Sequence, residues 1–353
     1  MNLHDVAREA GVSIATVSRV INDQDVVRGP TRKRVLKALE QSNYHPNINA
    51  RALSVRHNRV LGLIVSNLAN PYFIDVYGAL EGAAHRNAYE VLVAATDYSP
   101  ERLAHQVKLM LGRRVAGLGV VVSEMDETVT QILARSRIPV VVSGVEARAS
   151  NITRLRVNCE RGMQRLLDHL CSLGHRKMAF VDHHSSLESI TERRRAFLKG
   201  MAKFDRAQSR IFTGSDSLEG GRQVTRDLLL SDLKPTAVVC VNDRMAIGVL
   251  KELCENGIRV PERLSVTGFD NTIYSEYVNP ALTTIHIDRE KIALYLFESL
   301  TGQNPPTGGE TLSVSREIVI DTQLVVREST GPAFSHRHSR PRRVLSAVAE
   351  SSP

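Results

Sequence analysis

A series of short apolar runs, alternating with longer amphipathic segments, most restricts the folds open to this 353-residue chain. The runs at 60–66, 89–96, 115–123 and 138–144 are separated by helix-like segments at 73–88, 100–113 and 126–136. Nearly continuous apolar runs are typical of strands buried on both faces, and their alternation with helices indicates βαβ units. The rhythm resumes at 177–182, 236–242 and 263–269. The sequence therefore predicts two similar α/β halves, each built on a parallel sheet.

Polar residues stand at the carboxyl ends of these predicted strands. Ligands of open α/β sheets bind beyond the carboxyl ends of the strands. We therefore expect a cleft for a small hydrophilic molecule between the halves. The strand-end residues are Ser66-Asn67, Thr96-Asp97, Ser123, Asp182, Asn242-Asp243 and Asp270-Asn271.

The first 46 residues have the pattern of three short helices. Apolar residues recur at helical spacing from Leu3 to Ala10, and Gly11 suits the left-handed residue that ends a helix. Ser13 is a suitable N-cap for a second helix, and a third is indicated over 31–42. Two short helices joined by a tight glycine-containing turn, with a third to bury them, form a helix-turn-helix unit.

The second helix of such a unit enters the major groove of DNA, and its N-terminal residues meet the base edges. Ile14 and Ala15 offer only apolar contacts, for instance to a thymine methyl group. Arg19 suits either a guanine or a phosphate, and the sequence leaves both roles open. The candidate DNA-contacting residues of this unit are Ser13, Ile14, Ala15, Thr16, Ser18, Arg19 and Asn22.

Excess positive charge is confined to the two ends of the chain. The net charge is +8, of which residues 1–59 carry +5 and residues 331–353 carry +3, so that residues 60–330 are neutral. A basic terminal module beside a neutral body suits the neutralisation of nucleic-acid phosphates, whereas a merely soluble basic surface would spread the charge.

Several classes of protein are disfavoured by what the sequence lacks. There is no apolar run of 18 residues and no secretory signal at the N-terminus, so we expect a cytoplasmic protein without a membrane span. The motifs HExxH, GxSxG and the Walker loop are missing, so we expect neither an enzyme nor a cofactor or metal site. We expect reduced, packed thiols at Cys159, Cys171, Cys240 and Cys254.

The run LHDVAREAGVSIATVSRVIND, followed by TRKRVLKALEQSNYHPNINARALSVR, resembles the lac repressor (LacI) family of bacterial regulators. The resemblance continues through NPYF from residue 70, VCVNDRMAIG from 239 and SVTGFDN from 265, and covers roughly residues 2–328. It implies an all-α helix-turn-helix DNA-binding domain plus an α/β effector domain of two parallel-sheet subdomains, crossed by three strands and similar to periplasmic binding proteins. The implied boundaries are 1–46 for DNA binding, 47–59 for a hinge, 60–330 for effector binding and dimerisation, and 331–353 for a disordered basic tail.

The resemblance also implies roles for single residues. In the hinge, Leu53 would enter the minor groove, where an apolar wedge kinks DNA, and Asn47 and Ala50 would lie at the same interface. In the effector domain, Arg193 would bind the ligand. Arg194 and Arg195 are the alternatives if the match to the family's arginine position is shifted along the sequence. The remaining implied ligand contacts are Asn67, Tyr72, Phe73, Asn242 and Asp270. Structural roles are open for three of these, as a turn cap for Asp270, a helix cap for Asn242 and a core position for Phe73.

Two departures from the family pattern bear on the ligand. Asn158 stands where many members have aspartate, and the segment around Asp216 lacks an aromatic residue that members often place against a sugar ring. The three arginines at 193–195 favour an anionic effector, such as a sugar acid or sugar phosphate, over a neutral pyranose.

These observations predict a transcriptional repressor whose operator affinity is controlled by a small metabolite (a sugar, sugar acid or sugar phosphate). A homodimer would bind pseudo-palindromic operator DNA, because each half-site meets one recognition helix. Effector and operator would shift each other's affinity by the same factor. The alternatives are a corepressor-dependent regulator of the same fold and one controlled by a partner protein.

Overall fold

The computed structural model describes residues 3–21, 26–42, 58–143, 149–183, 188–302 and 316–334. The chain divides into two compact units, Met1–Asn58 and Arg59–Pro353. Each unit has its own buried apolar core.

The first unit contains the three expected helices, α1 (Leu3–Ala10), α2 (Ile14–Ile21) and α3 (Gly29–Ser42). Gly11 has a φ of 60°, the left-handed conformation expected of it, and the Val12 amide donates to the Ala7 carbonyl at 3.0 Å to close the turn. One fully buried valine from each helix meets in the centre, namely Val6, Val17 and Val35.

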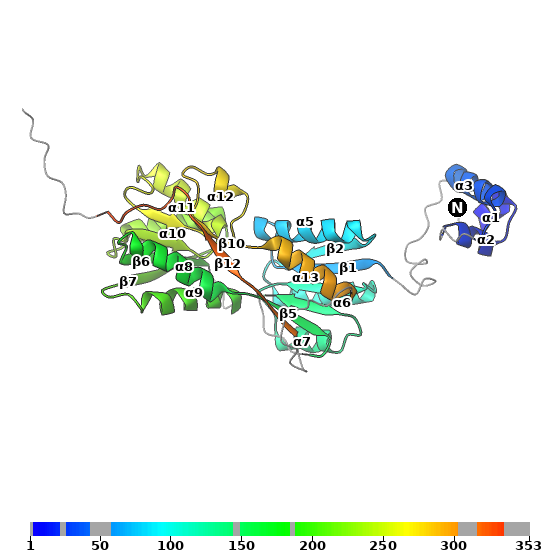
Figure 1. Ribbon diagram of the computed structural model, residues 1–353, viewed down its shortest axis with the longest axis horizontal. Helices are drawn as coiled ribbons and strands as arrows, with labels where there is room; N and C mark the ends of the chain where they lie inside the picture. Colours follow the sequence, from blue (N-terminus) through cyan, green and yellow to red (C-terminus); the bar gives the residue numbers. More distant parts are fainter. Residues whose placement is uncertain are drawn as a thin grey trace, which may run out of the picture. The chain divides into compact units, whose positions relative to one another are not determined.

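The second unit begins with a six-stranded parallel sheet in the order β11-β5-β4-β3-β1-β2. Figure 1 labels β1, β2 and β5 of this sheet. Successive residues of a strand point to opposite faces. Leu63 of β1 accordingly packs in the cluster formed with α5 (Pro71–Arg86) and α13 (Arg289–Thr301), whereas Ile64 packs with α6 (Pro100–Gly112) and α7 (Glu127–Ala134). The strands are β1 (Val60–Val65), β2 (Glu90–Ala95), β3 (Gly117–Val121), β4 (Val140–Ser143), β5 (Ile152–Val157) and β11 (Arg316–Ile320).

A second parallel sheet, in the order β7-β6-β8-β9, forms the other subdomain, and β10 and β12 pair antiparallel beside it. Helix α8 packs on α9, and α10 packs on α11. The strands are β6 (Lys177–His183), β7 (Gln208–Gly214), β8 (Ala237–Cys240), β9 (Ser265–Thr267), β10 (Thr284–Ile287) and β12 (Thr322–Val325). The helices are α8 (Cys159–Ser172), α9 (Glu188–Met201), α10 (Leu218–Leu230), α11 (Asp243–Glu255) and α12 (Tyr274–Tyr277).

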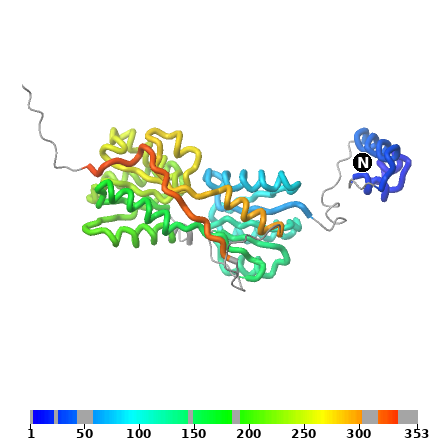
Figure 2. The backbone as a smooth tube through the Cα atoms, in the orientation of Figure 1, coloured from blue at the N-terminus to red at the C-terminus, as the bar shows by residue number. Residues whose placement is uncertain are grey.

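The chain crosses between the subdomains three times, after β5, after β10 and after β11. Figure 2 shows the last crossing as the red segment that runs from one subdomain to the other. Asn158 lies at the first crossing, where its amide donates to the Ile320 carbonyl at 2.9 Å and its side chain caps α8. The residue that departs from the family pattern therefore has a structural role at a crossing. The two-subdomain architecture confirms the predicted fold class.

The apolar pattern does not indicate every strand. Strand β5 has the sequence ITRLRV, and its arginines Arg154 and Arg156 remain partly accessible beside Glu317 of β11. The expectation of packed thiols is also wrong at one position, because Cys254 is exposed while the other three cysteines are buried. Leu253 occupies the inward position at that turn of α11, which leaves Cys254 on the outer side.

Candidate functional site

The candidate DNA-reading face lies on α2 of the first unit. Ser13, Ile14, Ala15 and Arg19 are exposed, and Thr16 and Ser18 are half-buried. The Ser13 Oγ accepts a hydrogen bond from the Thr16 amide at 3.2 Å and lies 2.9 Å from the Thr16 hydroxyl, so that Ser13 caps the helix as expected.

Ile14, at the start of the helix, leaves 37% of its surface exposed, and an exposed apolar side chain at this position suits contact with a base edge. Four further predicted DNA contacts, Asn22, Asn47, Ala50 and Leu53, lie outside the described residues.

A cleft between the two subdomains encloses about 850 Å³ of space, part of it open to solvent. Residues from both subdomains line it, and they include five of the six predicted effector contacts: Tyr72, Phe73, Arg193, Asn242 and Asp270. Asn67 is not among the lining residues. Its side chain accepts from the Ala69 amide at 2.7 Å and shapes the turn before α5.

Arg193 and Asp270 form an ion pair in the cleft wall, with 2.9 Å between Nη2 and Oδ1. The Arg193 Nη1 donates to the Val241 carbonyl at 2.7 Å, and the guanidinium lies 4.2 Å from the centre of the Phe269 ring. The buried Arg193 Nε has no hydrogen-bond partner within the described part of the chain. Buried polar atoms are normally satisfied, so an arginine with an unused donor in a cleft suits ligand binding.

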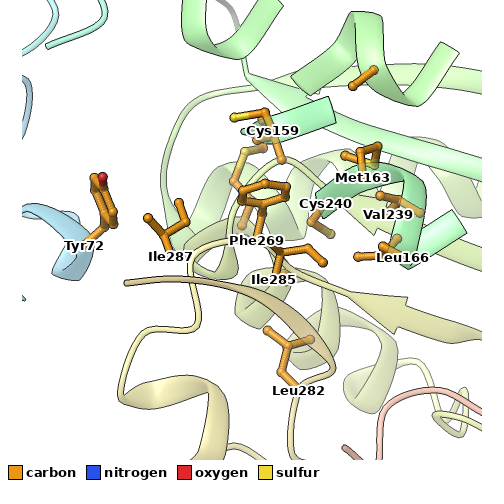
Figure 3. Packing of buried hydrophobic residues seen from close by; sticks show 14 of the residues in the cluster. Tyr72, Cys159, Met163, Leu166, Val239, Cys240, Phe269, Leu282, Ile285 and Ile287 are labelled. Atoms are coloured by element: carbon orange, nitrogen blue, oxygen red, sulfur yellow. The ribbon is translucent and has the colours of Figure 1, made fainter. Parts of the chain in front are cut away.

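Figure 3 shows buried apolar side chains of this domain, with the Phe269 ring between Cys159 and Ile285, and Tyr72 on a separate element to one side. The Tyr72 and Phe73 rings meet edge to face, with 5.2 Å between their centres. Burial raises the pKa of the Tyr72 hydroxyl, and the Asp270 charge raises it further. The hydroxyl therefore remains protonated and can donate a hydrogen bond. Phe73 is both a buried core residue and part of the cleft wall.

Asp270 has an unusual backbone and an unusual pKa. Its φ of 121° lies in a region that disfavours residues other than glycine, and its amide bonds to the Ile285 carbonyl at 2.9 Å. Burial raises the pKa of Asp270 to about 7, although Arg193 lowers it. Strain and a shifted pKa at one residue in a cleft are typical of functional positions.

The structure separates the three neighbouring arginines of α9. Arg193 lines the cleft, Arg194 donates to Asp182 at 2.5 Å, and Arg195 is exposed. Only one of the three arginines faces the cleft, so the run of three does not by itself favour an anionic effector.

Asn242 both caps α11 and lines the cleft. Its Oδ1 accepts from the Met245 amide at 2.9 Å, and its Nδ2 donates to Asp216 at 2.8 Å. The cleft also contains residues that the sequence did not single out. Tyr98 follows the strand-end pair Thr96-Asp97 by one position, which was the one available signal. The charged or titratable residues among the others are Arg154, Arg156, His183 and Glu192.

No helix within the described ranges has the length and apolar character needed to cross a membrane. No three His, Cys, Asp or Glu side chains of the described part are grouped so that they could hold a metal ion.

Comparisons with known proteins agree with both units. Residues 2–47 match the family model of bacterial regulatory proteins, lacI family, and residues 167–330 match a periplasmic binding protein-like domain. The chain is 33% identical over 301 residues to the HTH-type transcriptional repressor PurR of Vibrio parahaemolyticus, covering 84% of this chain and 90% of that protein. It is 31% identical over 325 residues to PurR of Mannheimia succiniciproducens, covering 90% and 97%.

The fold is also similar to that of a solved repressor. A crystal structure of the lac repressor dimer bound to operator and the anti-inducer ONPF superimposes with a TM-score of 0.78 at 27% identity, covering 94% of this chain and 99% of that one.

A helix-turn-helix unit followed in one chain by a two-subdomain domain with a ligand cleft defines a DNA-binding regulator that responds to a small molecule. The chain belongs to the LacI family of bacterial regulatory proteins, and it is a transcriptional repressor controlled by a small-molecule effector. The comparisons do not favour control by a partner protein.

Proposed function

We propose that this repressor acts in the cytoplasm as a dimer on pseudo-palindromic operator DNA, and that its effector is a polar, ring-shaped molecule such as a sugar. The observation that carries the ligand class is the wall formed by the Arg193–Asp270 pair, with Tyr72 and Phe73 on the opposite side. A fixed guanidinium and a carboxylate bind vicinal hydroxyl groups, and the aromatic rings cover an apolar ring face.

The first experiment is a thermal-shift screen of the purified protein against sugars, sugar acids, sugar phosphates and nucleobases. Compounds that raise the melting temperature are then tested for their effect on binding to an operator fragment selected from genomic DNA. Mass action predicts stabilisation of about 2.7 kcal/mol at a ligand concentration of about 100 times Kd. If nothing stabilises a protein that still binds its operator, the assignment of the cleft is wrong.

Arg193→Ala should abolish the response to the effector and leave operator binding intact. Arg195→Ala is the matched control, because Arg195 lies two positions away on α9 but is exposed outside the cleft. An Arg193→Ala variant that still responds to the effector, or an Arg195→Ala variant that does not, would contradict the proposed site.

Arg19 on α2 tests the DNA-reading face. Arg19→Ala should weaken operator binding by about ten- to hundred-fold, as expected for loss of one base or phosphate contact. A base contact predicts relaxed specificity at one operator position, whereas a phosphate contact predicts uniform weakening and a smaller salt dependence. Arg8→Ala is the control, since Arg8 lies on α1 rather than α2 and pairs there with Asp5. Equal losses for both variants would assign the effect to net charge alone.

A further inference from the structure

Tyr98 and Asp216 form a hydrogen bond from one wall of the cleft to the other. Tyr98 lies between β2 and α6, in the subdomain of the six-stranded sheet, and Asp216 lies between β7 and α10 in the other subdomain. The Tyr98 hydroxyl donates to the Asp216 Oδ2 at 2.6 Å. The Tyr98 ring also lies 5.8 Å from the ring of His183, at the end of β6. Two contacts of one side chain therefore join the subdomains.

Asp216 is held in place by its own subdomain. Its Oδ1 accepts from the Asn242 Nδ2 at 2.8 Å, its backbone carbonyl accepts from Arg244 at 2.8 Å, and the Arg244 guanidinium lies 3.9 Å from Oδ2. Only 5% of the Asp216 side chain is exposed. The carboxylate therefore offers one oxygen to Tyr98 from a fixed position.

Tyr98 is held just as firmly on the opposite side. Asp97 and Tyr98 have φ angles of 49° and 62°, and Ser99 directly after them caps α6 by accepting from the Arg102 amide at 3.1 Å. Burial and the Asp216 charge both raise the pKa of the Tyr98 hydroxyl, which keeps it a donor at neutral pH. Two consecutive residues in a strained backbone region are typical of functional positions.

We infer that the hydrogen bond between Tyr98 and Asp216 is a latch that holds the two subdomains together across the cleft. The inference rests on the proposed function, because the latched cleft is the one assigned to the effector. Asp216 accepts a hydrogen bond from Asn242, which lines the cleft. A ligand beside Asn242 therefore also lies beside the latch. Release of the latch opens the cleft for ligand entry, and Tyr98 is a positioning residue for the relative placement of the two subdomains.

The ring of Tyr98 also provides the cleft with an aromatic side chain next to Asp216. Residues 213–220, on either side of Asp216, include no aromatic residue, and Tyr98 lines the cleft from the opposite subdomain. An aromatic wall that depends on closure contacts a ligand ring only in the closed form. Ligand binding and closure are then favoured together.

A double-mutant cycle tests the contact without ligand or DNA. Tyr98→Phe removes only the hydroxyl and keeps the ring, and Asp216→Ala removes the acceptor. The equilibrium constants for urea unfolding of the wild type, both single variants and the double variant give the coupling. A hydrogen bond to a charged group predicts a coupling of roughly ten- to hundred-fold in these constants. Additive effects would overturn the inference.

Spin labels test closure itself. In a background with the exposed Cys254 changed to Ser, labelled cysteines replace His105 on α6 and Gln223 on α10, which are both exposed. Dilution with unlabelled protein leaves one labelled chain per dimer. The double variant should shift the label-to-label distances away from those of the wild type, whereas Tyr277→Phe, at a tyrosine that is 77% exposed, should not. Unchanged distances in the double variant would overturn the latch even where the cycle shows coupling. The proposed function would survive that result, because it depends on ligand and operator binding.

Discussion

Replacing Asp270 by Asn should make the repressor more stable at neutral pH while it weakens effector binding. The Asp270 carboxyl is 2% exposed, and burial raises its pKa from 3.8 to about 7. The unfolded chain ionises this group above pH 3.8, whereas the folded chain keeps it protonated up to about pH 7. The free energy of unfolding therefore falls as the pH rises between these two values, because the folded state binds the extra proton.

The size of the effect follows from the two pKa values. Each unit of difference corresponds to about 1.4 kcal/mol, so the range from 3.8 to about 7 sets a ceiling of about 4 kcal/mol. Asparagine resembles the protonated acid in shape and lacks the titration. Its carbonyl oxygen can still accept from the Arg193 Nη2 that now bonds to Asp270. We expect the stability advantage of Asp270→Asn over the wild type to grow as the pH rises from about 4 to about 7, and to stay constant above that range.

The assay is urea unfolding followed by circular dichroism between about pH 5 and pH 8, at one fixed protein concentration because a dimer's stability depends on it. Glu252→Gln is the control, since it also replaces a carboxyl group by an amide, but at a residue whose pKa is lowered rather than raised. Hydrogen bonds from Arg226 and Arg222 hold the pKa of Glu252 at about 2, below its ordinary 4.5. That variant should be less stable than the wild type at neutral pH. An Asp270→Asn variant that is less stable at neutral pH, or whose advantage does not change with pH, would refute the reasoning.

Two further predictions concern the body of the effector domain. Gly248→Ala should destabilise it by roughly 1–3 kcal/mol, because a Cβ there would lie 2.0 Å from the Leu218 carbonyl oxygen. A Cβ at Gly78 on α5 meets nothing within 4 Å, so Gly78→Ala should be neutral or stabilising. Calorimetry of both variants checks this. The ring of His175 lies 2.9 Å from both the Thr236 hydroxyl and the Gly331 carbonyl, and burial lowers its pKa. The unfolded state therefore binds more protons than the folded state, and the free energy of unfolding should fall as the pH drops below about 6.5. His175→Gln should reduce that slope in the same urea titration, and an unchanged slope would contradict the role given to His175.

The sequence by itself determined the local elements, because the signals for them are local. The apolar periods predicted α1, α2 and most strands of both sheets, and Gly11 and Ser13 ended and began helices as expected. The strand-end rule placed Asn242 and Asp270 at the cleft. These features depend on residues within a few positions of one another, so the chain alone carries the information.

The tertiary structure decided which side chains meet. Arg193 and Arg194 are neighbours on one helix, and only the packing of α9 turns the first toward Asp270 and the second toward Asp182. The apolar pattern did not predict strand β5, because its two arginines pair with Glu317 of β11, more than 150 positions away in the sequence.

The Tyr98–Asp216 contact joins residues 118 positions apart, and the pKa of Asp270 depends on burial by several elements. A periodic pattern of apolar residues does not predict contacts between residues so far apart in the sequence. Contacts between distant segments form only when both subdomains are folded and placed, so the chemistry of the cleft is a property of the tertiary structure.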